Sequence, residues 1–220
     1  MQLKAENISF RYTNKSPWIL NDISMEIQEG ERVAIVGPSG YGKSTLAKIL
    51  AGYEKATSGQ ILLNDKPLPD KGFCPVQMVY QHPELAVNPR WKMEKILNEC
   101  WRPDKELLDR MGIESSWLTR WPSELSGGEL QRFCIARVLS PETRFLICDE
   151  ITTMLDVITQ AQIWKLLLEI SEKRNLGMLV ITHNMALAEK VCTRIINLQE
   201  LQSESMCKKI IYTVGREQRQ

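Results

Sequence analysis

A glycine-rich segment, GPSGYGKST at residues 37–45, constrains the fold of this chain more than any other feature. It follows an apolar run, VAIV, and precedes a helix-like segment, LAKILAG. Three glycines let the backbone bend so that successive N–H groups point inward, and the helix adds the positive end of its dipole. The pattern predicts a phosphate-binding loop between a strand and a helix, and hence a nucleoside triphosphate as ligand. A glycine-rich turn that only happens to precede a helix is the alternative, which the Lys-Ser pair disfavours.

Two side chains of this loop predict contacts with phosphate and metal. Lys43 is placed to reach the β- and γ-phosphates, and the Ser44 hydroxyl is placed to ligate a Mg²⁺ ion that bridges them. The loop residues predicted to contact the nucleotide are Gly37, Pro38, Ser39, Gly40, Tyr41, Gly42, Lys43, Ser44 and Thr45.

A second glycine pair, in ELSGGELQRFCIARVL at residues 124–139, predicts another anion site. Ser126, Gly127 and Gly128 open a helix there and offer a hydroxyl and unobstructed backbone N–H groups. An ordinary Ser N-cap beside a glycine pair is the alternative. Taken alone, the segment does not separate the two interpretations.

Two carboxylates end an apolar strand in RFLICDE, residues 144–150. Asp149 is in position to hold Mg²⁺, usually through water, and Glu150 to orient and deprotonate an attacking water. His183 ends a later apolar strand, MLVITHN, where a satisfied surface histidine is the alternative. The other histidine, His82, is far away in sequence, so the spacing argues against a zinc site.

The order of these motifs resembles the ATP-binding-cassette (ABC) ATPases, the energy-converting subunits of ABC transporters, over nearly the whole chain. Residues 37–45 are similar to the Walker A loop, and LSGGE at 125–129 is similar to the family signature. FLICDE at 145–150 resembles Walker B with its catalytic glutamate, and TMLD resembles the D-loop ending in Asp156. The resemblance implies that the nucleotide is ATP.

Three further side chains acquire roles from this resemblance. Gln81 is similar to the Q-loop glutamine, which would contact Mg²⁺ and the lytic water, and His183 to the switch histidine, which would contact the γ-phosphate. Tyr12, in SFRY, is similar to the aromatic that stacks on adenine. Without the resemblance, Tyr12 would be a half-buried sheet residue and Gln81 an ordinary polar residue at a strand end.

The resemblance also implies that one chain supplies half of each ATP site. Two ATPase subunits would meet head to tail, so that Ser126, Gly127, Gly128 and Glu129 serve the nucleotide of a second ABC subunit. The other implied partners are membrane permease subunits and a solute-binding protein, with this chain peripheral on the cytoplasmic face of the membrane.

Several residues depart from the usual family pattern. Glu129 stands where Gln is more common, and activity should survive because the Ser and both glycines remain. Met154 brings bulk into the D-loop, which predicts weaker homodimer packing. His82 replaces a frequent acidic residue, and Tyr41 replaces a smaller one.

The expected architecture is α/β: a P-loop NTPase with a mainly parallel sheet core. An antiparallel β subdomain is expected up to Gly30 and again in SGQILLNDKPL, and a helical signature subdomain over about residues 83–134, inserted in a RecA-like core. Residues 1–220 are expected to form a single domain, and the tail from residue 207 predicts one more strand. The expected core strands are 33–36, 78–80, 145–148, 179–182 and 195–198.

Four tryptophans crowd the helical region, where packing in a small bundle is favoured over a partner-docking surface. They are Trp91, Trp101, Trp117 and Trp121.

Composition limits the class of partner and compartment. The chain has 220 residues, a net charge of +1 and 43% hydrophobic residues, which suits one globular unit and argues against nucleic acid. Its six cysteines form no CxxC pair, which fits a reducing cytoplasm. No apolar run is long enough to cross a bilayer, so membrane attachment would come from a partner.

The subfamily is indicated more weakly. YQHPELAVNPRWKMEKIL, LQRFCIARVL and LDVITQAQIWKLL resemble the ATPases of dipeptide, oligopeptide and nickel importers. The missing Pro- and Cys-rich C-terminal extension slightly favours the nickel type. The alternatives are an exporter or lipoprotein-release ATPase, and a non-transport ABC ATPase; a GTPase lacks support because no NKxD motif is present.

Overall fold

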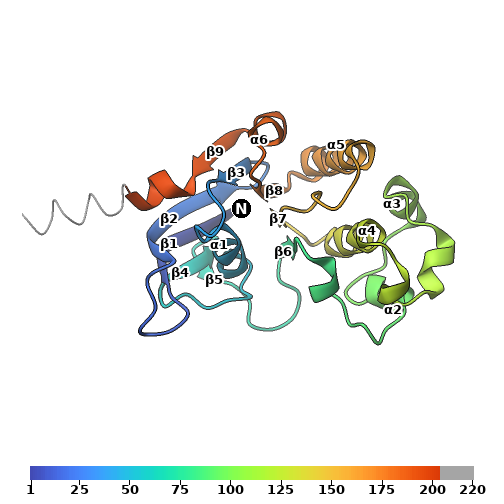
Figure 1. The fold of residues 1–220 in the computed structure, drawn as a ribbon, viewed down its shortest axis with the longest axis horizontal. Coiled ribbons are helices and arrows are strands. Elements are labelled where there is room, and N and C mark those ends of the chain that lie inside the picture. The colour runs from blue at the N-terminus through green and yellow to red at the C-terminus, as the bar shows by residue number, and fades with distance from the viewer. Residues whose placement is uncertain (204–220) are drawn as a thin grey trace, which may run out of the picture.

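The computed structural model, which describes residues 1–203, divides the strands between two sheets (Figure 1). The first sheet is antiparallel, in the order β2-β1-β4-β5. Its strands are β1 (Gln2–Phe10), β2 (Leu20–Gln28), β4 (Ser58–Leu63) and β5 (Lys66–Pro67). The predicted N-terminal antiparallel part is therefore confirmed, whereas the strand predicted beyond residue 207 lies outside the described residues.

The second sheet is parallel, in the order β6-β7-β8-β3-β9. Its strands are β6 (Val76–Val79), β7 (Phe145–Asp149), β8 (Gly177–Ile181), β3 (Arg32–Val36) and β9 (Arg194–Asn197). Every residue of β7 and β8 is buried, as expected for central strands covered on both faces. The five predicted core strands are confirmed, with ends that differ by one or two residues. Because the strands are parallel, their carboxyl ends meet at one edge of the sheet.

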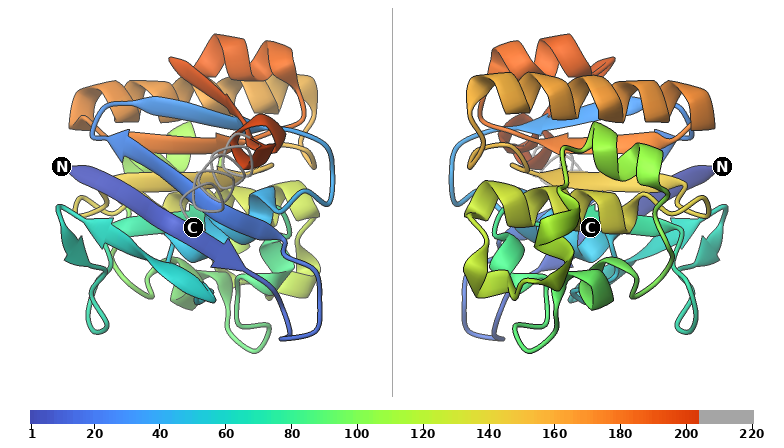
Figure 2. Two further views of the ribbon diagram at one scale, coloured as in Figure 1. Left: turned by 90° about the vertical axis from the view of Figure 1, so that its left-hand side faces the viewer. Right: turned by 90° about the vertical axis from the view of Figure 1, so that its right-hand side faces the viewer.

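Helices cover both faces of the parallel sheet. Figure 2 shows α5 (Val157–Arg174) and α6 (Met185–Val191) above the sheet and the antiparallel strands below it. Between the two sheets lies α1 (Lys43–Leu50), whose Leu46 and Ile49 join one hydrophobic cluster with strands of both sheets. The start of α1 is thereby fixed at the edge where the parallel strands end.

In the described structure, the regular elements between β6 and β7 are all helices, joined by loops. They are η1 (Pro83–Leu85), α2 (Met93–Leu97), α3 (Lys105–Arg110), η2 (Ser115–Thr119), η3 (Pro122–Glu124) and α4 (Gly127–Val138). Asp104 begins α3 by accepting a hydrogen bond from the N–H of Leu107. Since α4 continues to Val138, the helix passes the predicted boundary at residue 134, and the extent of the helical subdomain stays a prediction.

The tryptophans of this region mostly pack in its core. Trp117 is buried with its ring centroid 6.5 Å from that of Phe133, and Trp91 and Trp101 are partly buried against the same cluster. Trp121 differs, because it is exposed and lies under the ammonium of Lys92. Among the described residues no helix has the length and apolarity to span a membrane.

Candidate nucleotide-binding site

The glycine-rich loop connects β3 to α1 and holds its curvature with positive φ angles. These are 143° at Gly37, 80° at Gly40 and 89° at Gly42. A Cβ atom on Gly42 would lie 2.9 Å from Cγ2 of Ile19 and 3.1 Å from its carbonyl oxygen. Glycine is therefore required at residue 42 both by conformation and by space.

Lys43, the first residue of α1, lies inside this loop. Its Nζ donates hydrogen bonds of 2.8 Å to the carbonyl oxygens of Gly37 and Pro38, and the residue is 7% exposed. The loop is thus folded around an ammonium group, which supplies the positive charge that a bound phosphate needs.

A cavity of about 380 Å³ opens beside the loop and brings together residues from distant parts of the sequence. It is lined by Tyr12, Ile19, Ser39, Gly40, Gly42, Lys43, Ser44, Thr45, Gln81 and Glu150. Of the predicted nucleotide contacts, Gly37, Pro38 and Tyr41 do not line it. Ile19 is not predictable from the sequence as a lining residue, because an isoleucine beside a strand carries no signal that separates a ligand contact from a core residue.

Tyr12 lies just beyond the end of β1. It is 67% exposed, and its ring meets that of Phe10 edge to face at 5.1 Å. A half-buried sheet position, the alternative for this residue, does not describe it. An exposed aromatic at the rim of the cavity can stack on a planar ligand.

Ser44 and Asp149 form the part of the site that can hold a metal. The Ser44 hydroxyl donates to Oδ1 of Asp149 over 3.1 Å, and Asp149 is 4% exposed at the end of β7. Burial raises the pKa of Asp149, although the hydrogen bond from Ser44 opposes that effect. A buried carboxylate beside a hydroxyl matches the oxygen ligands of Mg²⁺, which commonly takes one or two protein ligands together with phosphates and water.

Glu150 lies where three parallel strands end. Gln81, after β6, donates from Nε2 to Oε2 of Glu150 over 3.2 Å, and Nδ1 of His183, after β8, lies 3.3 Å from Oε1. Both carboxylate oxygens are therefore held. The Glu150 backbone has a φ of +49°, and its N–H donates to Ile181 O. Strained backbone of this kind is concentrated at functional sites, where it presets the direction of a side chain.

The family comparison agrees with this geometry. The family model described as ABC transporter matches residues 20–153, which is more than half of the chain. The chain belongs to the ABC transporter family. Membership in the ABC family makes it an ATP-binding protein and an ATPase.

Individual ABC relatives match over most of their length. The chain is 35% identical to the nickel import ATP-binding protein NikE of Escherichia coli (strain K12), covering 89% of this chain and 81% of NikE. It is also 35% identical to the nickel import system ATP-binding protein NikE of Staphylococcus aureus (strain N315), covering 90% and 87%. The dimeric structure of MJ0796, a bacterial ABC transporter cassette, superimposes with a TM-score of 0.76 at 27% identity, covering 89% of this chain and 93% of MJ0796.

The segment that resembles the ABC signature forms a helix cap. Ser126 is the N-cap of α4: its Oγ accepts from the Glu129 N–H, and Oε2 of Glu129 accepts from the Ser126 N–H over 2.6 Å. The Ser126 backbone N–H lowers the pKa of Glu129 because it stabilises the carboxylate. Glu129, which is unusual at this position in the family, thus accepts a hydrogen bond from a backbone N–H at the start of its own helix.

The residues 126–129 do not line the cavity beside Lys43. Instead they meet the segment that resembles the ABC D-loop, since a Cβ on Gly127 would lie 3.3 Å from Sδ of Met154. Asp156 ends that segment as the N-cap of α5, where it accepts from the Thr159 N–H over 3.0 Å. The side chain of Met154 therefore lies against Gly127 of the same chain.

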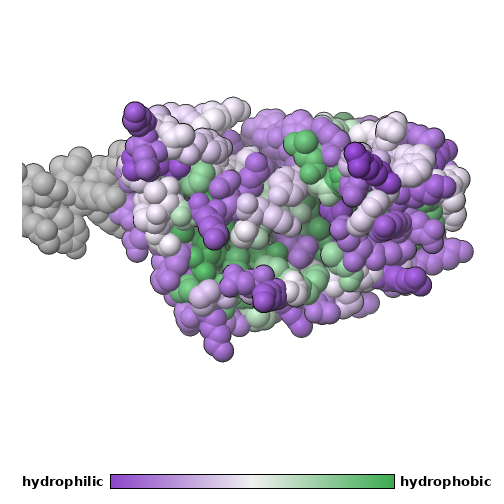
Figure 3. All heavy atoms as spheres, turned by 90° about the horizontal axis from the view of Figure 1, so that it is seen from below, coloured by the Kyte–Doolittle hydropathy of each residue, from purple (hydrophilic) through white to green (hydrophobic). Residues whose placement is uncertain are grey.

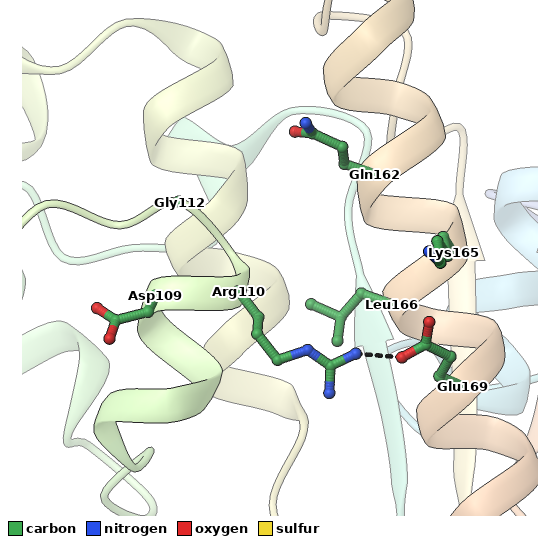
Figure 4. A pocket seen from close by; sticks show the side chains of 7 residues that line it. All are labelled: Asp109, Arg110, Gly112, Gln162, Lys165, Leu166 and Glu169. Carbon is green, nitrogen blue, oxygen red and sulfur yellow. Dashed lines mark hydrogen bonds and ion pairs between the residues drawn. The ribbon is translucent and has the colours of Figure 1, made fainter.

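A separate hollow of about 370 Å³ lies between α3 and α5 (Figure 4). Arg110 reaches across it and forms an ion pair with Glu169. None of the candidate site residues of this ABC protein lines this hollow. The pair connects the inserted helices to the core but adds nothing to the nucleotide site.

Proposed function

We propose that the chain is the ATPase subunit of an ABC importer that takes up nickel or a related metal chelate, and that it works at the cytoplasmic face of the membrane. The observation that carries the ATPase chemistry is the placement of Glu150, with both oxygens held, at the cavity that also contains Lys43 and Ser44. The nickel-import relatives support the substrate class. A dipeptide or oligopeptide is the related alternative.

Each group of site residues has a separate role in binding or hydrolysing MgATP. Tyr12 stacks on the adenine, and the loop N–H groups with Lys43 bind the phosphates. Ser44 and Asp149 would hold Mg²⁺, which would supply positive charge to the β- and γ-phosphates. Glu150 accepts the proton of the attacking water, while Gln81 and His183 keep its carboxylate directed at the cavity.

A second ABC subunit completes the site. The cavity has no lining residue from 126–129, and these residues present a helix start that can bind another nucleotide. MJ0796, which superimposes on this chain, is a dimer. We infer a head-to-tail dimer in which Ser126 contacts the γ-phosphate held by the partner, and Met154 is compatible with a non-identical partner without requiring one.

Permease subunits bind at a groove between the Gln81 segment and the inserted helices. A hollow of about 330 Å³ there is bordered by Tyr80, Leu85, Glu99 and Arg137, and Leu85 is 78% exposed. Figure 3 shows hydrophobic side chains gathered on the face that lies below the sheets in Figure 1. A solute-binding protein belongs to the same importer on the other side of the membrane.

The test is co-purification from membranes with the permease and second ABC subunit, followed by ATPase assays. Glu150→Gln should keep ATP binding and lower hydrolysis by about two orders of magnitude, the usual effect of a lost general base. Ser126→Arg should lower hydrolysis by the assembled complex, because the side chain fills the partner's γ-phosphate site.

The matched control is Ser116→Arg, which places the same side chain on an exposed serine of η2. Full turnover by Glu150→Gln would remove Glu150 from the reaction. Equal rates for Ser126→Arg and Ser116→Arg would contradict the shared-site dimer.

A further inference from the structure

Helix α4 binds the chain segment that follows β6 at three backbone carbonyls. The hydrogen bonds run from Gln131 Nε2 to Tyr80 O (3.0 Å), from Cys134 Sγ to Pro83 O (3.8 Å) and from Arg137 Nη2 to Ala86 O (2.7 Å). Donors three residues apart lie on one face of a helix, and here the acceptors are also three residues apart. The segment of residues 80–86 is therefore attached along α4.

The first of these donors, Gln131, is the most buried. It is 1% exposed, and its amide oxygen has no hydrogen-bond partner among the described residues. A buried amide that is half satisfied costs free energy that an apolar side chain of the same length avoids. Retaining glutamine at this position thus points to a need for the donor at the Tyr80 carbonyl.

That carbonyl belongs to the peptide unit that Tyr80 shares with Gln81. Because a peptide unit is planar, a hydrogen bond to the Tyr80 oxygen also fixes the backbone nitrogen of Gln81. The side chain of Gln81 in turn donates to Oε2 of Glu150 over 3.2 Å. Two hydrogen bonds and one peptide unit connect Gln131 to the carboxylate of Glu150.

We propose that Gln131 is a positioning residue for Glu150, acting through the Tyr80–Gln81 peptide and the Gln81 amide. This inference rests on the ATPase function proposed above and deepens it. Ser126 caps the same helix five residues earlier, so the helix that offers the signature to a partner's nucleotide also sets the carboxylate in its own chain.

The first test is Gln131→Met, which keeps length and apolar packing but removes the donor. The kcat for ATP hydrolysis should fall about tenfold while the ATP dissociation constant stays unchanged, because Gln131 does not line the cavity. In a Gln81→Ala background, Gln131→Met should have no further effect on kcat. Additive losses in the double variant, or an unchanged kcat in the single one, would overturn the proposal.

The control is Thr143→Val, which removes another buried side-chain bond to a carbonyl, from Oγ1 to Val138 O over 2.7 Å. Like Gln131→Met, it removes the side-chain donor to a buried backbone carbonyl, but it should keep the wild-type kcat. Loss of kcat in both variants, in proportion to stability, would mean that Gln131 is merely structural.

A second variant, Gln131→Glu, decides the question if Gln131→Met does not fold. A buried carboxyl has a raised pKa, and its protonated form can donate to the Tyr80 carbonyl as the amide does. The ratio of its kcat to that of the wild type should therefore be highest at low pH and fall as pH rises. A ratio independent of pH would contradict the positioning role.

Glu150→Gln, assayed in parallel, separates this inference from the proposed function. Absence of ATP hydrolysis by the wild-type complex would overturn the proposed function itself. Wild-type hydrolysis by Glu150→Gln would remove Glu150 from the reaction and would overturn the positioning role of Gln131 with it. An inactive Glu150→Gln together with a fully active Gln131→Met would overturn the positioning role alone.

Discussion

Ser44 donates a hydrogen bond to Asp149 over 3.1 Å, although 105 residues separate the two in the chain. The bond joins the start of α1 to the end of β7 and leaves a carboxylate buried beside a hydroxyl. A carboxylate in this position can bind a cation. In the ligand-free protein, burial destabilises its charged form.

Asp149→Asn should therefore stabilise the ligand-free protein at neutral pH. Burial raises the pKa of Asp149 above its ordinary value of 3.8. A carboxyl with a raised folded-state pKa contributes stability that is complete below 3.8 and is lost as pH rises through the folded-state pKa. The melting temperature of Asp149→Asn should exceed that of the wild type at pH 7, and the difference should shrink as the pH approaches 4.

Addition of MgATP should reverse this order, because only the wild type keeps the carboxylate for the metal. A larger thermal shift with MgATP in Asp149→Asn than in the wild type would contradict the metal assignment.

Lys43→Ala should weaken ATP binding because the phosphates lose a buried cation. A hydrogen bond to a charged group contributes about 1.5–3 kcal/mol, so the dissociation constant should rise roughly ten- to hundredfold. Lys48→Ala is the matched control, since Lys48 lies in α1 but is exposed and does not line the cavity. Titration calorimetry with ATP measures both, and equal affinities would argue against the phosphate-loop interpretation.

Gly42→Ala and Gly40→Ala separate backbone strain from steric contact. Both glycines have φ near +80° to +90°, but a Cβ on Gly40 meets nothing within 4 Å, whereas one on Gly42 meets Ile19 and Leu20. Gly40→Ala should cost about 1–2 kcal/mol of unfolding free energy from strain alone. Gly42→Ala should lower the free energy of unfolding by more than Gly40→Ala does. Urea unfolding measures both variants, and a larger loss in Gly40→Ala would contradict the prediction.

Glu129→Gln should slightly destabilise the protein. Glutamine can still accept from the Ser126 N–H, but the negative charge at the start of α4 is lost, which costs about 0.3–1 kcal/mol at low salt. The pKa of Glu129 is lowered from 4.5, so the contribution of its charge is present above that pH and is lost as pH falls through the folded-state pKa. The difference in unfolding free energy between wild type and variant should accordingly vanish in acid and persist at pH 7.

The prediction from sequence was strongest where neighbouring residues interact. The strand, loop and helix around residues 37–50 depend on glycine conformations and an apolar pattern within one short segment, and all three are confirmed. The cap formed by Ser126 and Glu129 also depends only on residues three positions apart, but comparison with the family pattern marks Glu129 only as a departure. The ends of the inserted helices were harder to predict, since the amphipathic spacing in residues 91–101 extends beyond α2.

By itself the sequence determined the glycine-rich loop, the parallel strands and the polar residues at their ends, because turn chemistry and apolar periodicity are local. Only the tertiary structure decided that Gln81 and His183 hold opposite oxygens of Glu150, since that depends on the order β6-β7-β8 in the sheet. The same is true of Gln131. Its position in α4 predicts which face is buried, but the carbonyl it meets belongs to a residue 51 positions earlier, brought there by packing of the whole core.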